Sequence, residues 1–181
     1  MTVGPAAAGL LAYNPDPFGA NGEWLRCGLH AHSTGSDGTL SPPDLAAAYR
    51  RAGYDVLCVT DHNKMTPVAG LSDERFLVLP GQEIHPLSPP SDHGTFHLVA
   101  INLREEIPGR ELTPNLTIAA ARAQGAEVVL AHPAWSSHHL DEILGLEGFV
   151  AIEVFNELAH RMAKGSSEDL WDRLPGPGGR P

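Results

Sequence analysis

The chain has 181 residues, of which 42% are hydrophobic and 19% are charged, and its formal net charge is −10. This length supports one sizeable hydrophobic core but not two ordinary domains, and the composition is that of a folded protein rather than a disordered one. The negative charge argues against a general nucleic-acid binder and against an anionic membrane as partner, although metal ions could still admit a small anionic substrate to one pocket.

Short apolar runs alternate with helical patterns between two segments of different composition. Residues 1–22 are rich in Gly, Pro, Ala and Asn and predict a flexible arm, and residues 175–181 form a Pro/Gly tail that we expect to be disordered. Residues 23–174 predict one domain. Its expected strands cover residues 24–29, 55–60, 76–79, 96–101, 128–131 and 149–154, and its expected helices cover 42–52, 114–124, 139–144 and 167–174.

The first helix and the second strand carry the clearest local signals. Ser41 stands where an N-cap is expected, two prolines follow in the first turn, and Gly53 ends the pattern. Residues 56–59 are continuously apolar, which indicates a strand buried on both faces. Strands and helices that alternate at this spacing predict an α/β fold with a largely parallel sheet, which right-handed crossovers would curl toward a barrel.

Two features bear on the cellular compartment. Cys27 and Cys58 lie in apolar runs, which favours reduced, buried side chains over a disulfide. Residues 6–12 are apolar, but this run is too short for a signal peptide and no basic residue precedes it. No later apolar run is long enough to span a membrane. We therefore expect a cytoplasmic protein.

Side chains that bind metals occur at the ends of successive predicted strands. His30 and His32 end the first strand as a His-x-His pair, whose rings point to the same side and can reach one ion. The later candidates are Asp37 in the following loop, then Asp61, His62, Glu83, His97, His132 and Glu153 on the next five strands or directly after them. Because the loops after parallel strands collect at one end of a sheet, these residues predict a polynuclear metal site there.

Each of these residues also has a simpler interpretation. A paired strand histidine can be an ordinary surface residue, Asp61 could cap a helix, and Glu83 could be a turn carboxylate. His132 precedes a proline and could be a hydrogen-bonded core histidine. The simpler interpretation requires several independent coincidences at the same strand ends, so the pattern as a whole favours the metal site.

Five motifs of the chain are similar, in order and approximate spacing, to those of one known family. They are His30-Ala-His32-Ser-Thr-Gly-Ser-Asp37-Gly-Thr, Thr60-Asp61-His62-Asn63, Gly81-Gln-Glu83, His97 within Phe-His-Leu-Val-Ala, and Ala131-His132-Pro133. They resemble the motifs of the PHP (polymerase and histidinol phosphatase) family of metal-dependent phosphoesterases, and the resemblance covers about residues 23–174. It implies a distorted (β/α)7 barrel.

The resemblance also implies ligands for two to three divalent ions. The implied ligands are His30, His32 and Glu83 for the first ion, Glu83, His97 and His132 for the second, and Asp37 with His62 for the third. Manganese, iron or zinc would suit such mixed nitrogen and oxygen ligands.

Other polar residues have expected roles around this centre. Asp61 is the candidate catalytic residue, because it could orient the adjacent ligand His62, although a structural turn carboxylate is an equal alternative. Trp135 and Asn156 are expected to line the substrate pocket, unless Trp135 belongs to the core. The histidines outside the strand ends are expected on the surface; they are His85, His93, His138, His139 and His160.

The chain departs from the family pattern near its end. Members of the family finish with a strand that carries an Asp-x-His pair, and no such pair occurs here. We interpret the change from a helical pattern to the Pro/Gly tail as a chain that was cut, or lost its reading frame, near Leu174. The barrel would then lack its last strand and two ligands, and it would expose the edges of its first and sixth strands.

The resemblance implies hydrolysis of small-molecule phosphate esters by a metal-activated hydroxide, without a protein nucleophile. One alternative is a truncated, catalytically impaired metal-binding remnant, and another is a hydrolase of non-phosphate esters or carbamates. The acidic charge argues against a third, a proofreading module of a DNA polymerase. The expected partner is a small phosphate ester rather than a membrane or nucleic acid, and the oligomeric state stays open.

Overall fold

The structure is a computed structural model that describes residues 19, 22–87 and 94–174. Most of the arm predicted over residues 1–22, and the whole tail predicted over residues 175–181, lie outside the described residues. Within these described segments, no helix has the length and apolar character needed to cross a membrane.

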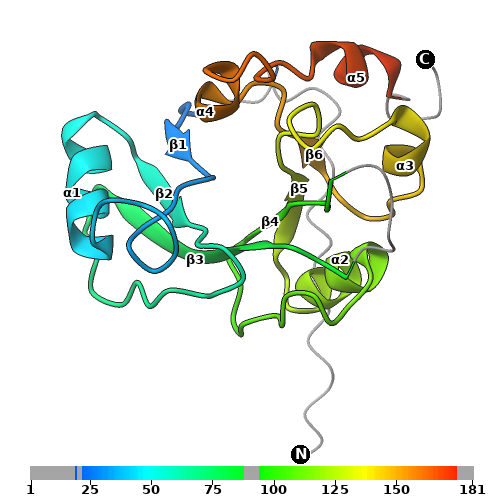
Figure 1. Cartoon of the computed structure of the whole chain (residues 1–181). Coiled ribbons are helices and arrows are strands. Elements are labelled where there is room, and N and C mark those ends of the chain that lie inside the picture. The colour runs from blue at the N-terminus through cyan, green and yellow to red at the C-terminus, as the bar shows by residue number, and fades with distance from the viewer. Residues whose placement is uncertain (1–18, 20–21, 88–93, 175–181) are drawn as a thin grey trace, which may run out of the picture.

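The described residues form a mixed α/β fold on one curled sheet of six strands (Figure 1). In chain order, which is also their order in the sheet, the strands are β1 (Cys27–Gly28), β2 (Val56–Val59), β3 (Leu77–Ile84), β4 (Leu98–Ile101), β5 (Glu127–Leu130) and β6 (Ala151–Ile152). Parallel pairing joins β1 to β2, β2 to β3, and β5 to β6. The predicted α/β class and the curled, barrel-like sheet are therefore confirmed.

β4 differs from the prediction of a largely parallel sheet. It pairs antiparallel with both β3 and β5. The described residues between β3 and β4 contain no helix, and antiparallel neighbours, unlike parallel ones, need no helical crossover. As a result the beginning of β4, rather than its end, lies at the sheet edge where the other strands end.

β3 is the longest strand and joins the two halves of the sheet. Its residues 77–80 pair with β2, and its residues 81–84 pair with β4. Gly81 lies at this change of partner, where an added Cβ would overlap the Cys58 side chain and the carbonyl oxygen of Ala100. The missing side chain therefore allows the close backbone approach at which one half of the sheet turns into the other.

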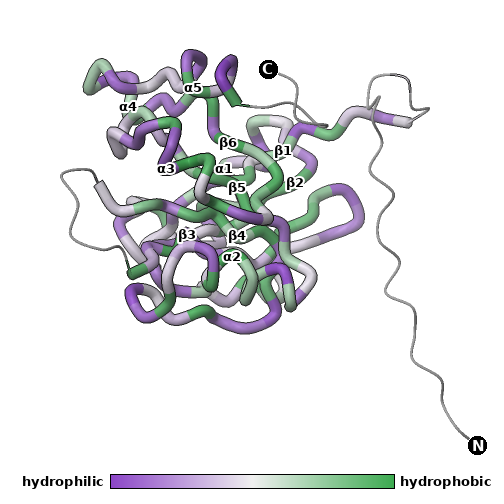
Figure 2. The backbone as a smooth tube through the Cα atoms, turned by 90° about the vertical axis from the view of Figure 1, so that its right-hand side faces the viewer, coloured by the Kyte–Doolittle hydropathy of each residue, from purple (hydrophilic) through white to green (hydrophobic). Residues whose placement is uncertain are grey.

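The described residues form five helices. They are α1 (Pro42–Arg51), α2 (Pro114–Ala123), α3 (Leu140–Leu144), α4 (Glu157–His160) and α5 (Glu168–Arg173). Buried side chains of α1, α2 and α3 pack against apolar side chains of the curled sheet. Leu45 of α1 shares one buried cluster with Leu57 of β2. Ile118 of α2 and Ile143 of α3 share another with Leu130 of β5. Figure 2 shows the hydrophobic segments gathered along the strands, with hydrophilic segments in the connecting loops.

The helix ends show which local signals could be predicted. The hydroxyl of Ser41 accepts the N–H of Asp44 at 3.3 Å, and Gly53 has a φ of 77°, so both predicted ends of α1 are confirmed. α4 was not predicted. It is a single turn capped by Asn156, whose side-chain oxygen accepts the N–H of Ala159 at 2.9 Å, and one turn is too short for a helical period to show in the sequence.

The two cysteines have different environments. Cys58 is buried in β2, as predicted, but Cys27 is exposed because β1 is a short strand at the sheet edge. Both are free thiols.

Candidate metal centre

Metal-binding side chains from every strand meet at one edge of the sheet. His30 and His32 follow β1, His62 follows β2, Glu83 lies near the end of β3, His132 follows β5 and Glu153 follows β6. His97 stands directly before β4 and reaches the same edge because β4 runs in the opposite direction. The antiparallel strand thus adds to the cluster rather than breaking it.

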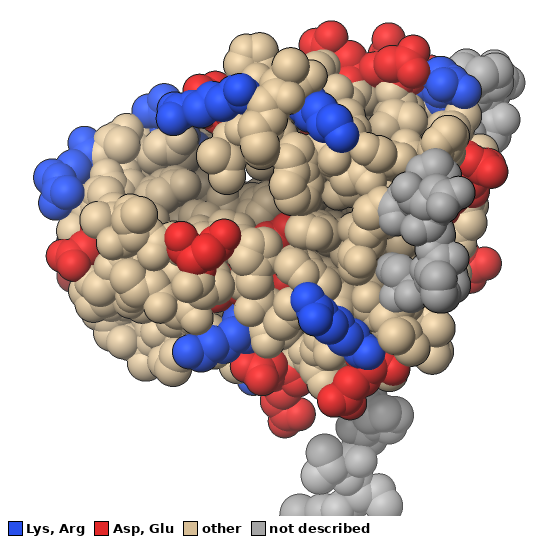
Figure 3. Space-filling model, viewed as in Figure 1, with Lys and Arg blue, Asp and Glu red and all other residues tan. Residues whose placement is uncertain are grey.

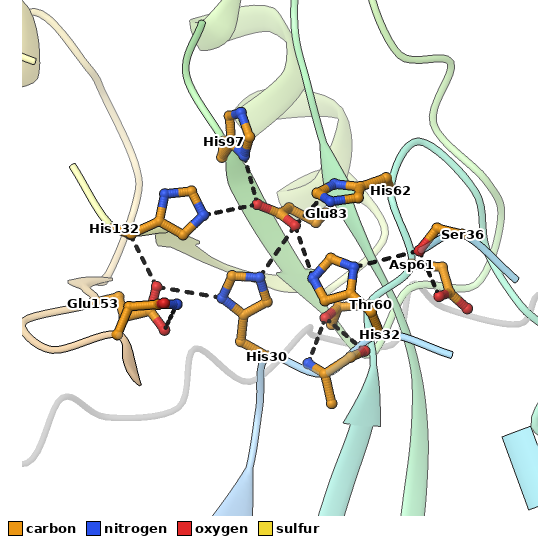
Figure 4. Close-up of polar contacts among 12 residues, drawn as sticks. His30, His32, Ser36, Thr60, Asp61, His62, Glu83, His97, His132 and Glu153 are labelled. Atoms are coloured by element: carbon orange, nitrogen blue, oxygen red, sulfur yellow. Dashed lines mark hydrogen bonds and ion pairs between the residues drawn. The ribbon is translucent and has the colours of Figure 1, made fainter. Parts of the chain in front are cut away.

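The Glu83 carboxylate lies at the middle of this cluster and has no exposed surface (Figure 4). Nitrogens of five histidines surround it: His97 Nδ1 at 2.7 Å and His132 Nε2 at 3.2 Å from Oε1, and His30 Nε2 at 3.1 Å, His32 Nε2 at 3.0 Å and His62 Nδ1 at 3.0 Å from Oε2. Five imidazoles around one buried carboxylate are far more than a structural role requires.

The positions of the imidazole nitrogens around Glu83 Oε2 are those expected of ligands that share one ion, rather than those of hydrogen-bond donors. Oε2 accepts no hydrogen bond of acceptable geometry, although three imidazole nitrogens lie within 3.1 Å of it. Those nitrogens therefore point past the oxygen rather than at it. Two ligand atoms that are each about 2.1 Å from one ion, at a right angle, lie roughly 3 Å apart. The nitrogen-rich donor set suits a divalent transition metal.

The protonation of the cluster follows from the same contacts. Burial alone would raise the pKa of the Glu83 carboxyl, but the close contacts with the surrounding histidines, His132 foremost, outweigh that effect and hold the pKa far below its usual range. Burial would likewise lower the pKa of His30, but its contacts with Glu153 and Glu83 raise it to about 10. Glu83 is therefore anionic, and a divalent ion bound here would replace protons that the metal-free cluster holds.

Glu153 is one of the strand-end candidates, but it is not among the ligands that the family resemblance implies. Its Oε2 is 3.3 Å from His30 Nδ1 and accepts the backbone N–H of His132 at 3.0 Å, and its Oε1 accepts an N–H of Asn156 at 3.1 Å. His132 has a φ of 27°, a left-handed conformation that costs a residue other than glycine about 1–3 kcal/mol. One carboxylate therefore holds two ligands in place, and its position at the end of a predicted strand was the available signal.

Replacing Glu153 with Gln should weaken the binding of a divalent ion by about 10- to 100-fold, the usual loss when a residue that orients ligands is changed. Glutamine keeps the size of the side chain but not the charge that faces His30. Competition with a chromophoric chelator measures the affinity. Glu168→Gln, on the exposed face of α5, makes the same charge change away from the centre. Equal affinities for both variants would contradict the role assigned to Glu153.

The third predicted ligand set lies nearer the surface. Asp37 Oδ1 is 3.1 Å from His32 Nδ1, and Asp37 Oδ2 is 3.4 Å from His62 Nε2. The Asp37 side chain is 66% exposed, whereas Glu83 is fully enclosed. Each of the two histidines faces Asp37 with one ring nitrogen and Glu83 with the other. They therefore stand between two candidate ion positions, of which the one beside Glu83 is the more enclosed.

Asp61, predicted as the catalytic residue, faces away from the cluster. Its buried carboxylate accepts the N–H and the hydroxyl of Ser33 at 2.7 and 2.6 Å, and the hydroxyls of Ser36, at 2.8 Å, and Thr66. Burial would raise the pKa of Asp61, but these hydrogen bonds lower it. Figure 4 places Asp61 beyond Ser36, on the far side from Glu83. This arrangement matches the alternative of a structural carboxylate, which holds the loop that carries Asp37, and not the catalytic prediction.

His85 was predicted on the surface, and the structure places it at the centre. Its Nε2 is 2.9 Å from His62 Nδ1, and its ring stacks on that of His97 with the centroids 4.0 Å apart. His85 follows Glu83 by two residues along extended chain, so both side chains point to the same side. The two-residue spacing between Glu83 and His85 was visible in the sequence.

The other described histidines are not part of the cluster. His138 was also predicted on the surface, but it is buried and stacks on Phe96 with the ring centroids 3.9 Å apart. His139 and His160 are exposed, as predicted. His93 lies outside the described residues.

A cavity of about 680 Å³ lies over the cluster, and Figure 3 shows the molecule hollowed at this point. All of the predicted ligands line it, together with Trp135 and Asn156, the two residues predicted to contact substrate. Trp135 stands edge-on to His97 and His132 and is 37% exposed, so it is not a core residue. Leu158 of α4 adds to an apolar wall. Among the described residues that line this cavity there is no Lys, Arg, Ser or Cys.

Comparisons with known proteins show the fold. No protein-family model matches the chain. A 48-residue stretch is 46% identical to the DNA polymerase/3′-5′ exonuclease PolX of Bacillus subtilis (strain 168), but it spans 26% of this chain and only 8% of that protein. A candidate metal-dependent phosphoesterase from Bifidobacterium adolescentis ATCC 15703 is similar in structure, with a TM-score of 0.61 at 15% identity over 82% of this chain and 81% of that chain.

Two further solved structures are similar to the chain. An amidohydrolase from Chromobacterium violaceum, with bound sulfate and no metal, has a TM-score of 0.60 at 16% identity over 76% of this chain and 81% of that one. A two-domain protein from Bacteroides vulgatus ATCC 8482, which contains a predicted PHP-like metal-dependent phosphoesterase, is 27% identical over 65% of this chain and 37% of that one, with a TM-score of 0.48. The TM-score of 0.61 to the candidate metal-dependent phosphoesterase confirms, at the level of the fold, the resemblance that the five motifs predicted.

Proposed function

We propose that this chain, which shares its fold with those hydrolases, is a metal-dependent hydrolase of small-molecule phosphate esters that works with two to three divalent ions. The observation that carries the proposal is the fully buried Glu83 carboxylate with five imidazole nitrogens 2.7–3.2 Å from its oxygens. Such a cluster needs positive charge, from protons or from metal ions, because its imidazole lone pairs would otherwise face buried negative charges in a site of low dielectric constant.

The ions, when bound, would supply an activated water as nucleophile and positive charge for the phosphoryl oxygens. The chain supplies the frame for that chemistry. Glu83 and the histidines fix the positions of the ions, and Glu153 keeps His30 and His132 from rotating. Among the described residues that line the cavity there is no serine or cysteine, which favours direct attack by water over a covalent intermediate on either side chain.

The charges of the cavity favour an activity that depends on metal. Glu83, Glu153 and Asp37 line it, and none of its described lining residues is a lysine or arginine. Apart from protonated histidines, the described residues of the metal-free cavity therefore offer a phosphate group no positive charge. The apolar wall of Trp135 and Leu158 lies beside the ligands, and it favours an ester whose leaving group carries a hydrophobic or aromatic portion.

The deciding experiment is a substrate panel assayed with the full-length chain and supplied Mn²⁺, Fe²⁺ or Zn²⁺. The panel contains phosphate monoesters, phosphate diesters, carboxyl esters and carbamates. We expect turnover of phosphate esters that a chelator abolishes and added metal restores. Turnover that survives complete metal removal, or a metal-loaded protein without turnover of any ester, would contradict the proposal; the second result would instead indicate a metal-binding remnant.

Hydrolysis of carbonyl compounds is the second candidate. The similarity of the fold to the Chromobacterium violaceum amidohydrolase favours it, and the same activated water can attack a carbonyl carbon. Metal-dependent turnover of the carboxyl esters or carbamates alone, with none of the phosphate esters, would establish this alternative.

Replacing Trp135 with Ala should raise KM by about 5- to 10-fold, with a smaller change in kcat, because a lost aromatic contact of about 1 kcal/mol weakens the bound substrate and transition state alike. The best substrate from the panel provides the measurement. Trp171→Ala, on the exposed surface of α5, serves as the matched control. An unchanged KM for Trp135→Ala would remove Trp135 from the substrate site.

A further inference from the structure

The backbone around His85 is held in one position relative to the metal centre. The backbone N–H of His85 donates to the side-chain oxygen of Asn63 at 2.8 Å. Asn63 itself has a φ of 49°, directly after His62. The loop that carries one ligand is therefore tied to the residue that follows β3. This tie places the His85 ring between those of His62 and His97, with centroids 4.7 and 4.0 Å away.

The ring nitrogens of His85 and His62 are close enough that they must either share a hydrogen bond or bind the same ion. His85 Nε2 is 2.9 Å from His62 Nδ1, which is itself 3.0 Å from Glu83 Oε2. If His62 Nδ1 binds an ion beside Glu83, its only lone pair is occupied and it cannot accept a hydrogen bond from His85. The contact is then favourable only if both lone pairs face the same cation.

We infer that His85 is a further metal ligand, which joins His62, Glu83 and His97 around one ion. The four residues can each offer a ligand atom such that all of these atoms lie within 4.8 Å of one another. Three imidazole nitrogens and a carboxylate oxygen form a donor set typical of zinc, iron or manganese. The inference rests on the proposed metal-dependent function and adds to it a ligand that the five sequence motifs do not contain.

The competing interpretation is that His85 only orients His62. In that case His62 binds an ion through Nε2, beside Asp37, and its Nδ1 shares a proton with His85. Affinity alone cannot separate the two roles, because removing an orienting residue also costs about 10- to 100-fold in metal affinity. The test must therefore count the imidazoles bound to metal.

Cobalt(II) provides that count for the full-length chain. In the proton NMR spectrum of the Co²⁺-loaded protein, the ring N–H of each coordinated imidazole is shifted far outside the normal range, whereas an imidazole that only touches a ligand is shifted much less. We expect His85→Ala to lose one such signal and to bind one ion more weakly. His160→Ala, an exposed histidine outside the cavity, should keep every signal. Circular dichroism of the metal-free proteins establishes that both variants are folded.

His85→Gln supplies the second arm, because its amide can still form a hydrogen bond with His62 but has no imidazole nitrogen. We expect the missing signal and the lower affinity to persist. Recovery of wild-type affinity in His85→Gln, or an undiminished number of shifted signals in His85→Ala, would overturn the inference while leaving the proposed function intact. A wild-type chain that takes up no Co²⁺ would overturn both.

Discussion

Replacing Glu83 with Gln should abolish tight ion binding and lower kcat/KM by about 10³-fold or more. Glutamine has nearly the same shape but no negative charge, and its amide nitrogen would be a donor among imidazoles that already act as donors or ligands. Removing a single group that stabilises charge in a transition state costs about 10²- to 10³-fold. Glu83 supports every enclosed ion position, so its loss should exceed that range.

Two measurements check this expectation for Glu83. Elemental analysis gives the number of ions that the purified chain retains, and steady-state kinetics with the best ester of the panel gives kcat/KM. Glu127→Gln, a change at an exposed residue that pairs with Arg122, is the matched control. If Glu83→Gln retained its ions and its activity, the Glu83 carboxylate would be structural and the proposed centre would be wrong.

Replacing Asp61 with Asn should lower the free energy of unfolding of the metal-free chain by about 2–4 kcal/mol. Hydrogen bonds to a buried charged acceptor contribute about 1.5–3 kcal/mol each, but an asparagine can keep part of them. Its amide nitrogen would be turned toward Ser33, Ser36 or Thr66, whose hydroxyls now donate to the carboxylate. Gly35 packs so closely against Asp61 that the loop has little room to adjust.

Urea denaturation measures this loss, with Asp169→Asn on the exposed face of α5 as the control. The same variants separate the two interpretations of Asp61. A structural carboxylate predicts lower stability with kcat reduced only in proportion to the unfolded fraction. A large fall in kcat at unchanged stability would instead restore Asp61 as the catalytic residue.

The location of the centre could be predicted because it depends only on which strands are consecutive in the chain and neighbours in the sheet. Residues at the ends of consecutive strands meet if the strands are neighbours, and here the order in the sheet follows the order in the chain. His30, His62 and Glu83 could be placed together on that basis. His97 reached the same edge for a different reason, the reversal of β4, which depends on pairing between distant segments that apolar patterns do not reveal.

The roles of individual residues could be predicted less well than their location. Asp61 and Glu153 are both carboxylates at strand ends, and only the surrounding contacts show that the first turns into a loop and the second toward the ligands. His85 was overlooked because it follows the motif carboxylate instead of ending a predicted strand. α4, which forms part of the cavity wall, is too short to produce a periodic signal.

The contact between His30 and Glu153 has a consequence for the stability of the whole sheet. β1 and β6 lie at its two ends and do not pair with each other, so among the described contacts this ion pair links residues that follow the first strand and the last. An ion bound at His30 would therefore hold the segment after β1 against the segment after β6. Part of the free energy of ion binding would then stabilise the folded chain. Removal of the ions should then make the short terminal strands easier to separate and more accessible to an added protease.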